Sequence, residues 1–287
     1  MTQTNASWAQ SISGDWTAAA NWAGGVVPGT SGTTASSDTA SLSVSGTYTV
    51  TVGATSAWSI GSVSISQPGA TLLVGSSGLA VSGSVTLNAG TLMLGGMLTG
   101  GIVSQQGGTL AVQSTSYSAG LNSVTVDGTL NLSGAGLRLS LVGANQFLGA
   151  SGGSGSVLLT GAGTTLSVSD TETLAGFTLT FGSTSSSAAV LQLGSYFAQS
   201  LTLGTGAVVN VTGRALISNL SQTVSKQVVN SGTISVASGG LLEVGTGVQL
   251  ASGGSPATLA IQSGGILQLD GSYTTAGLHS LVTSDAG

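Results

Sequence analysis

The feature that most constrains the fold is a short phrase that recurs along the chain: a glycine, one or two small or polar residues, and then apolar residues alternating with polar ones. It occurs at residues 69–74 (GATLLV), 90–94 (GTLML), 108–112 (GTLAV), 128–132 (GTLNL), 163–168 (GTTLSV), 206–211 (GAVVNV), 232–236 (GTISV), 240–244 (GLLEV) and 265–269 (GILQL). The first four of these glycines are 21, 18 and 20 residues apart (69 to 90, 90 to 108, 108 to 128). Such a period indicates a stacked-repeat protein, and the alternation makes the repeat unit a strand and a turn.

We therefore predict an all-β fold, a right-handed parallel β-helix (β-solenoid). A helix-rich fold is disfavoured because glycine and β-branched residues are frequent and no long window keeps a 3.6-residue period. A β-sandwich or an outer-membrane barrel is the competing prediction. Barrels carry girdles of aromatic residues, whereas aromatic residues make up only 4% of this chain.

The N-terminal segment differs from the repeats and predicts a cap. Three of the four tryptophans and Pro28 lie between about Ser7 and Asp38. Bulky side chains there would cover the strand edges and the apolar interior that the end of a solenoid exposes. We predict a cap with the first strands at 1–52 and solenoid repeats at 53–287, with the repeats truncated or continued beyond Gly287 because the last ten residues show no matching aromatic or proline-rich cap.

Composition excludes several functions. Three basic residues against eight acidic ones give a net charge of −5, so no basic patch is expected to bind nucleic acid. The absence of cysteine excludes disulfides and thiolate metal sites, and a single histidine excludes a multi-histidine site. No stretch approaches the ~20 apolar residues of a membrane helix. The start of the chain lacks the basic and apolar regions of a signal peptide. We nevertheless expect an extracellular or cell-surface location, because cysteine-free, lysine-poor chains rich in Gly, Ser and Thr are common among bacterial extracellular repeat proteins.

Two parts of the sequence resemble known bacterial proteins. The glycine-led phrasing, as in residues 229–244 (VNSGTISVASGGLLEV), resembles autotransporter passenger regions and filamentous-haemagglutinin-like adhesins. Residues 14–28 (GDWTAAANWAGGVVP), followed by Asp38-Thr-Ala and Tyr48-Thr-Val, resemble the opening of large secreted β-strand-repeat proteins of bacteria. The resemblance implies a secreted or surface β-solenoid of adhesive or structural use, and it implies no enzyme.

The acids offer one candidate for catalysis. Asp170 and Glu172 are two residues apart, so on a strand they would share a face with their carboxyl groups roughly 6–7 Å apart, a separation that suits an inverting glycosidase. Their neighbours are Ser, Thr and Leu, without the aromatic platforms and further charges of a sugar-cleaving groove. We therefore interpret them as an exposed polar pair near a turn, and we predict no catalytic residue, no cofactor and no metal site. His279, the only histidine, is not expected to act in a catalytic triad because no Gly-x-Ser-x-Gly elbow is present.

The aromatic residues offer a candidate for binding. Trp8, Trp16, Trp22 and Tyr48 could stack on sugar rings, or they could fill the interior of the cap, where large aromatic side chains bury the most area. We favour the cap.

The threonines Thr47, Thr49 and Thr51 alternate as in ice-binding solenoids, but no other coil repeats a Thr-x-Thr at the same place, so an ordered hydroxyl array is not expected.

The sequence thus predicts a non-enzymatic extracellular solenoid that acts as a structural or adhesive rod. We expect it to self-associate through the ends of the solenoid, end to end into a fibre or surface layer, or to belong to a larger parent chain. A glycan or host surface is the expected ligand. A protein that binds or cleaves polysaccharide on the same scaffold is the alternative.

Overall fold

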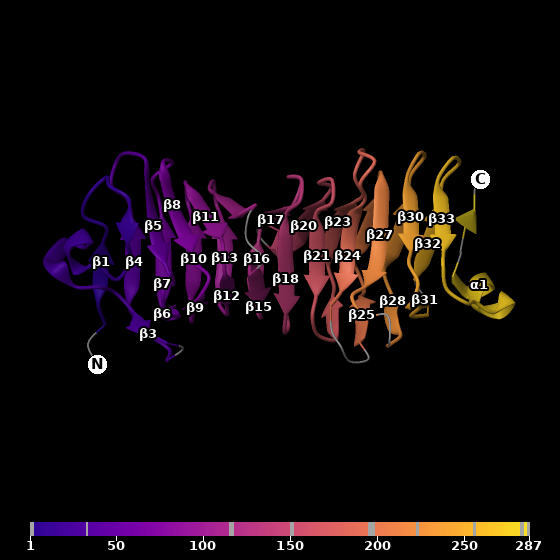
Figure 1. Cartoon of the computed structure of the whole chain (residues 1–287), viewed down its shortest axis with the longest axis horizontal. Coiled ribbons are helices and arrows are strands. Elements are labelled where there is room, and N and C mark those ends of the chain that lie inside the picture. The colour runs from indigo at the N-terminus through magenta and orange to yellow at the C-terminus, as the bar shows by residue number, and fades with distance from the viewer. Residues whose placement is uncertain are drawn as a thin grey trace. The chain divides into compact units, whose positions relative to one another are not determined.

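The structure is a computed structural model that describes residues 3–32, 34–114, 118–149, 152–194, 199–221, 224–254, 257–281 and 284–285. The chain forms two compact units, residues 1–129 and 130–287. The predicted boundary between 52 and 53 lies inside the first unit. The chain is a β-solenoid, as predicted, and Figure 1 labels many of its strands.

The first unit winds through three sheets, so that each coil adds one strand to each sheet. Neighbouring strands are parallel, apart from the antiparallel pair β3 and β6. The first sheet contains β1 (Asn5–Ser7), β4 (Thr39–Leu42), β7 (Ser62–Ile65), β10 (Ser84–Leu87), β13 (Ile102–Gln105) and β16 (Thr125–Asp127); the second contains β2 (Gly14–Asp15), β5 (Tyr48–Val52), β8 (Ala70–Val74), β11 (Thr91–Leu94) and β14 (Thr109–Val112); the third contains β3 (Thr30–Ser31), β6 (Trp58–Ile60), β9 (Leu79–Val81), β12 (Met97–Thr99) and β15 (Gly120–Asn122).

The second unit repeats this plan. Its strands pair in parallel, except that β19 and β20 form an antiparallel pair. One sheet contains β19 (Gln146–Gly149), β20 (Gly153–Leu159), β23 (Phe177–Phe181), β26 (Val208–Val211), β29 (Thr233–Val236), β32 (Thr258–Ile261) and β34 (Ser284–Asp285); another contains β18 (Arg138–Val142), β21 (Thr165–Val168), β24 (Ala189–Leu193), β27 (Arg214–Asn219), β30 (Leu241–Val244) and β33 (Ile266–Leu269); the last contains β22 (Glu172–Leu174), β25 (Gln199–Leu203), β28 (Lys226–Asn230) and β31 (Val248–Ser252). The short strand β17 (Thr129–Asn131) spans the boundary between the units.

The core of each unit consists of side chains stacked in columns. Because side chains alternate across a strand, every second residue faces the interior. In the first sheet, Val63, Val85, Val103 and Val126 occupy the same register position in successive strands, and all four are buried. The apolar positions of the recurring phrase are therefore the core, as the alternation predicted.

A further set of glycines, outside the recurring phrase, allows successive coils to pass close together at one corner. An added Cβ at Gly96 would collide with the carbonyl oxygen of Gly75, and one at Gly75 would lie 2.7 Å from the carbonyl oxygen of Gly53. These three residues follow one another from coil to coil. Glycine recurs there because a side chain would push one coil off the next.

The end of the second unit departs from the expectation of an uncovered last coil. A helix, α1 (Thr275–Leu281), contacts β31, and the hydroxyl oxygen of Tyr273 accepts a hydrogen bond of 3.0 Å from the Leu250 N–H. Strand β34 pairs with β32. A helix and a tyrosine thus cover one strand, where the sequence had suggested that nothing would. At this end, β33 and the two-residue β34 each keep an edge without a paired strand among the described residues.

Candidate functional site

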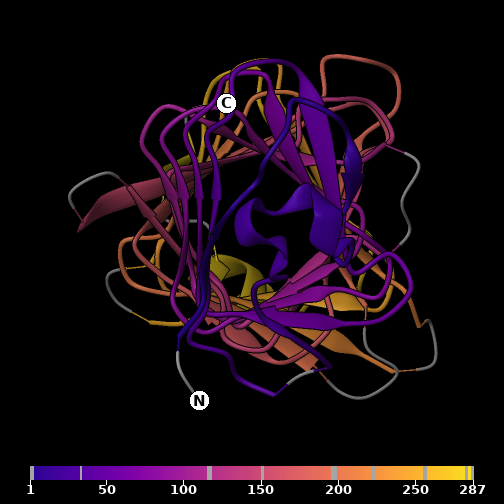
Figure 2. The same ribbon diagram turned by 90° about the vertical axis from the view of Figure 1, so that its left-hand side faces the viewer.

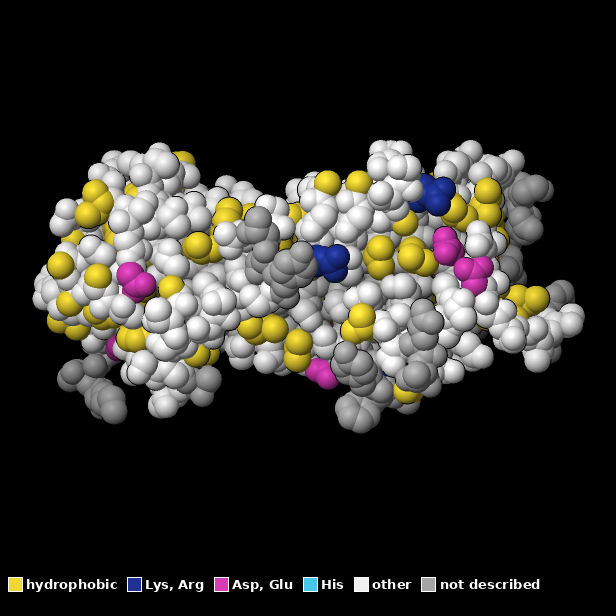
Figure 3. All heavy atoms as spheres, in the orientation of Figure 1, with side chains coloured by type: hydrophobic (Ala, Val, Ile, Leu, Met, Phe, Trp, Pro, Cys, Tyr) yellow, Lys and Arg dark blue, Asp and Glu magenta, His cyan; other side chains and the backbone are white. Residues whose placement is uncertain are grey.

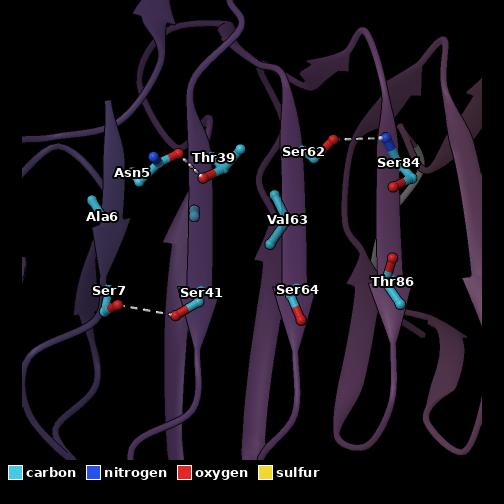
Figure 4. A pocket seen from close by; sticks show the side chains of 11 residues that line it. Asn5, Ala6, Ser7, Thr39, Ser41, Ser62, Val63, Ser64, Ser84 and Thr86 are labelled. Carbon is cyan, nitrogen blue, oxygen red and sulfur yellow. Dashed lines mark hydrogen bonds between the residues drawn. The ribbon is translucent and has the colours of Figure 1, made fainter. Parts of the chain in front are cut away.

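The outer face of the first sheet carries two columns of hydroxyl and amide side chains (Figure 4). It contributes most of the lining of a shallow groove of 410 Å³ over β1, β4, β7 and β10. In register, one column runs Asn5, Thr39, Ser62, Ser84 and the other runs Ser7, Ser41, Ser64, Thr86. Neighbouring groups in a column are about 4.8 Å apart and the columns about 7 Å apart, from the geometry of a sheet.

Some of these groups hydrogen-bond to one another. The Thr39 hydroxyl donates to Asn5 Oδ1 at 2.6 Å, and the Ser41 hydroxyl donates to Ser7 Oγ at 3.1 Å. A hydroxyl donates one hydrogen bond and accepts two, so the columns keep capacity for an external partner. The groove can therefore hydrogen-bond to a hydroxyl-rich surface along several strands at once.

A third hydroxyl column lies on the second sheet. Thr49, Thr71, Thr91 and Thr109 occupy one register position from β5 to β14. The position two residues later holds Thr51 only in β5; it is leucine in β8, methionine in β11 and alanine in β14. The sequence expectation that no other coil repeats Thr-x-Thr thus holds for this sheet.

The expectation that no hydroxyl array forms is wrong for the first sheet. There the hydroxyl pairs are Thr39 with Ser41, Ser62 with Ser64, and Ser84 with Thr86. The sequence carries the signal, because these pairs begin 23 and 22 residues apart, but serine is so common in this chain that they do not stand out.

The tryptophan segment closes the beginning of the first unit, as predicted. Trp8, Trp16 and Trp22 are 1%, 0% and 2% exposed and pack edge to face, with ring centroids 5.1 Å (Trp8 to Trp22) and 4.7 Å (Trp16 to Trp22) apart. In Figure 2 the segment that carries two short 3-10 turns, η1 (Ala19–Asn21) and η2 (Ala23–Gly25), lies across the coils of this unit. Tyr48 is also buried, and burial raises its pKa. Buried rings offer no face on which a sugar could stack.

Asp38 ties this segment to the first strands. Its Oδ1 accepts a hydrogen bond of 2.7 Å from the Thr4 N–H, and its Oδ2 accepts one of 2.8 Å from the Gly29 N–H. Its carbonyl oxygen accepts from the N–H groups of Gly61 and Ser62. One carboxylate thus joins the residues before β1 to the loop that follows the tryptophans.

The acids Asp170 and Glu172 do not form the predicted exposed pair. Asp170 precedes β22 and is exposed, whereas Glu172 faces inward from β22 and is 4% exposed. Asp170 Oδ2 accepts a hydrogen bond of 3.0 Å from the Gly143 N–H, and Glu172 Oε1 accepts one of 2.8 Å from the Asn145 N–H. Both carboxylates therefore bind backbone N–H groups of the turn in the preceding coil.

Burial raises the pKa of Glu172, an effect that hydrogen bonds from Asn145 partly offset and the nearby charge of Asp170 reinforces. Between its ordinary pKa and this raised pKa, the folded protein binds more protons than the unfolded chain. The contribution of Glu172 to stability is thus greatest below the ordinary pKa and falls as the pH rises through this window.

We expect Glu172→Gln to remove the loss of stability that ionisation of Glu172 causes as the pH rises. Glutamine keeps an acceptor for the Asn145 N–H and does not ionise. The free energy of unfolding, measured in urea from pH 4 to 8, should fall less with rising pH in the variant than in the parent. Glu243→Gln changes an outward-facing acid and controls for the loss of one charge. A steeper fall in Glu172→Gln would contradict this account.

The sequence did not predict that Lys226 is buried. Lys226 faces inward at the start of β28 and is buried, and this burial lowers its pKa. It occupies the register position of Gln199, whose amide nitrogen donates to the carbonyl oxygens of Val168 and Asp170 at 2.6 and 2.7 Å. A groove of 410 Å³ passes over both, lined also by Thr171, Ser200, Ser225, Gln227 and Gln249. Spaced by two from the buried Val228, Lys226 occupies a position that the repeat normally fills with an apolar residue.

Charged side chains are few among the uncharged ones on the face that Figure 3 shows, although two acidic side chains lie side by side there. Among the described residues, no three His, Cys, Asp or Glu side chains lie close enough to hold a metal ion. None of the described helices has the length and apolar character needed to cross a membrane. The side chain of His279 lies outside the described part of the structure.

Fold and surface together define a β-solenoid repeat protein with a closed N-terminal end and hydroxyl-lined outer faces. Comparisons with protein-family models, with curated proteins and with solved structures found no match to this chain.

Proposed function

We propose that the protein is a non-enzymatic extracellular β-solenoid with an adhesive or structural role, and that its adhesive surface is the hydroxyl face of the first sheet. The observation that carries the proposal is the groove over β1 to β10, where two columns of hydroxyl and amide groups repeat with the spacing of the strands. The composition and the resemblance to secreted β-strand-repeat proteins support the extracellular location.

The ligand class that fits this face is a polysaccharide or a glycan-covered surface. Sugar hydroxyls both donate and accept hydrogen bonds, as the serine and threonine hydroxyls of the groove do. Individually weak contacts repeated along several strands add up when the ligand is itself a repeating chain. Cleavage of the polysaccharide is the weaker alternative, because Asp170 and Glu172 are engaged by the backbone of the turn beside them.

Self-association is the second part of the proposal. Leu267 and Leu269 on β33 are partly exposed, although they occupy the register positions of Leu242 and Val244, which are buried. A last coil whose core residues reach solvent favours association with another chain.

Binding to insoluble polysaccharides such as cellulose and chitin tests the adhesive role. We expect the protein to co-sediment with at least one of them without releasing reducing ends. The double variant Ser41→Lys/Ser64→Lys, which places two long cations in the groove, should lose most of the binding. Thr71→Lys/Thr91→Lys changes outward positions of the second sheet and should bind as the parent does. Equal binding by both variants would reject the first sheet as the adhesive surface. If the protein releases reducing ends and Asp170→Ala abolishes this release, the function is polysaccharide cleavage and not adhesion.

A further inference from the structure

We propose that β33 is an interface for a second copy of this chain, and that the two β33 strands pair antiparallel about a two-fold axis through Gln268. This proposal rests on the proposed self-association. It specifies a second copy as the partner, the register of the two paired strands, and a dimer as the final assembly. It starts from the strand itself, because β33 pairs with β30 on one side and with no described strand on the other.

The backbone of β33 determines which groups the free edge presents. The N–H groups of Ile266 and Asp270 donate to the carbonyl oxygens of Gly240 and Val244, so residues 266, 268 and 270 direct their backbone groups toward β30. Backbone direction alternates along a strand. The N–H and C=O groups of Leu267 and Leu269 therefore point to the free edge, where they can pair with another strand.

The side chains select the register. In an antiparallel pair, residues directly opposite each other lie on the same face of the sheet. With Gln268 on the two-fold axis, Leu267 lies opposite the second copy's Leu269, and the partly exposed core residues cover one another. The two leucine pairs are then hydrogen-bonded pairs. They satisfy the two N–H and two C=O groups that each copy directs to the free edge.

Charge is compatible with this register. Asp270 is opposite Ile266 of the second copy, so the two acids lie at opposite ends of the pairing. The Gln268 side-chain N–H donates a hydrogen bond of 2.9 Å to Asp270 Oδ1 within its own chain. It lies opposite the uncharged Gln268 of the second copy. No like charges directly oppose each other, the arrangement that would destabilise the pair.

The other strand edges at this end do not compete. Strand β31 is covered by α1, and β32 is paired with β34. Strand β34 has an unpaired outer edge among the described residues, but it is only two residues long. At the start of the chain, the inward-facing Ala6 of β1 is buried and the tryptophans close the interior, so the edge of β1 does not expose a core side chain as β33 does. A two-fold contact at β33 uses the same surface on both copies, and it closes at a dimer instead of growing into a fibre.

A single cysteine tests the register. Gln268 and its copy would form a non-hydrogen-bonded pair with Cα atoms about 4.5 Å apart, within the range of a disulfide. The parent chain contains no cysteine. Gln268→Cys should therefore form a disulfide-linked dimer under mild oxidation, visible on a non-reducing gel. Glu243→Cys, on the same face of the neighbouring strand β30, should remain largely monomeric on that gel.

Light scattering coupled to size-exclusion chromatography tests the association itself. The full chain should shift from monomer to dimer as its concentration rises. Leu269→Pro removes an N–H that points to the free edge, so it should remain monomeric while its circular dichroism stays that of the parent. Ile266→Thr removes a 56% exposed apolar side chain but no edge donor, and it should still dimerise.

Three outcomes would overturn the inference: a parent that is monomeric at all concentrations, equal cross-linking of both cysteine variants, or assemblies that keep growing beyond the dimer. Open-ended growth would still agree with the proposed structural role, and failure to bind polysaccharide would leave the dimer intact. The two proposals can therefore fail separately.

Discussion

Replacing Trp16 by alanine is expected to lower the free energy of unfolding of the first unit by about 3–5 kcal/mol, the usual loss when a buried tryptophan is truncated. Trp16 is fully buried. Its indole N–H donates a hydrogen bond of 3.0 Å to the Pro28 carbonyl oxygen. Its own carbonyl oxygen accepts a hydrogen bond of 2.7 Å from the indole N–H of Trp22. The substitution removes the central ring of the cluster together with one hydrogen bond that holds the loop at Pro28.

Urea unfolding followed by tryptophan fluorescence is the appropriate measurement, because all four tryptophans lie in the first unit. Val26→Ala, at an exposed position of the same segment, is the control and should change stability by no more than about 0.5 kcal/mol. A loss below 1 kcal/mol in Trp16→Ala would show that the cluster does not stabilise the end of the solenoid.

The sequence was sufficient to predict the architecture because the repeat reports directly on the core. Inward positions such as Val85 and Val103 alternate with outward polar ones, and a period of two within a period of about twenty is difficult to satisfy by any other fold. The cap was predictable for a similar reason. Tryptophans are rare in this chain, and a cluster of them at one end has few structural uses.

The hydroxyl face was missed because its hydroxyl pairs can be told from the many other serines only once the register of the strands is known. Whether Ser41 stacks on Ser64 or beside it is decided by how many residues each turn contains, and the coils of this chain differ in length. The partners of Glu172 were hidden for the same reason. The turn at Gly143 and Asn145 is 27 residues away in sequence and adjacent only once the coils are stacked.

The cover over β31 was missed because its signal is weak. Tyr273 is a single aromatic residue, and α1 contains only seven residues without an obvious apolar period. The cap at the other end uses three large side chains, whereas this end uses one hydroxyl group and a short helix.

The last prediction concerns Gly96, one of the glycines at the corner where successive coils lie close together. We expect Gly96→Ala to destabilise the first unit by about 3 kcal/mol, a large loss for one methyl group. The backbone of Gly96 does not need a positive φ, so the penalty comes from space alone. The added Cβ would collide with the carbonyl oxygen of Gly75, which belongs to the preceding coil and cannot rotate away as a side chain would. Relief requires the two coils to separate, which weakens the parallel hydrogen bonds on either side of the corner.

The neighbouring glycine provides the control. At Gly95 an added Cβ would first meet the side-chain oxygen of Gln113, at 2.5 Å, and the flexible end of that side chain can move. Gly95→Ala should therefore cost clearly less than Gly96→Ala in the same fluorescence-monitored urea titration. If the two variants are equally stable, the close approach of the coils does not explain why glycine recurs. If only Gly96→Ala is destabilised, the recurring glycine is required by the spacing between coils, and the same substitution should be costly wherever one glycine lies directly against the backbone of the next coil.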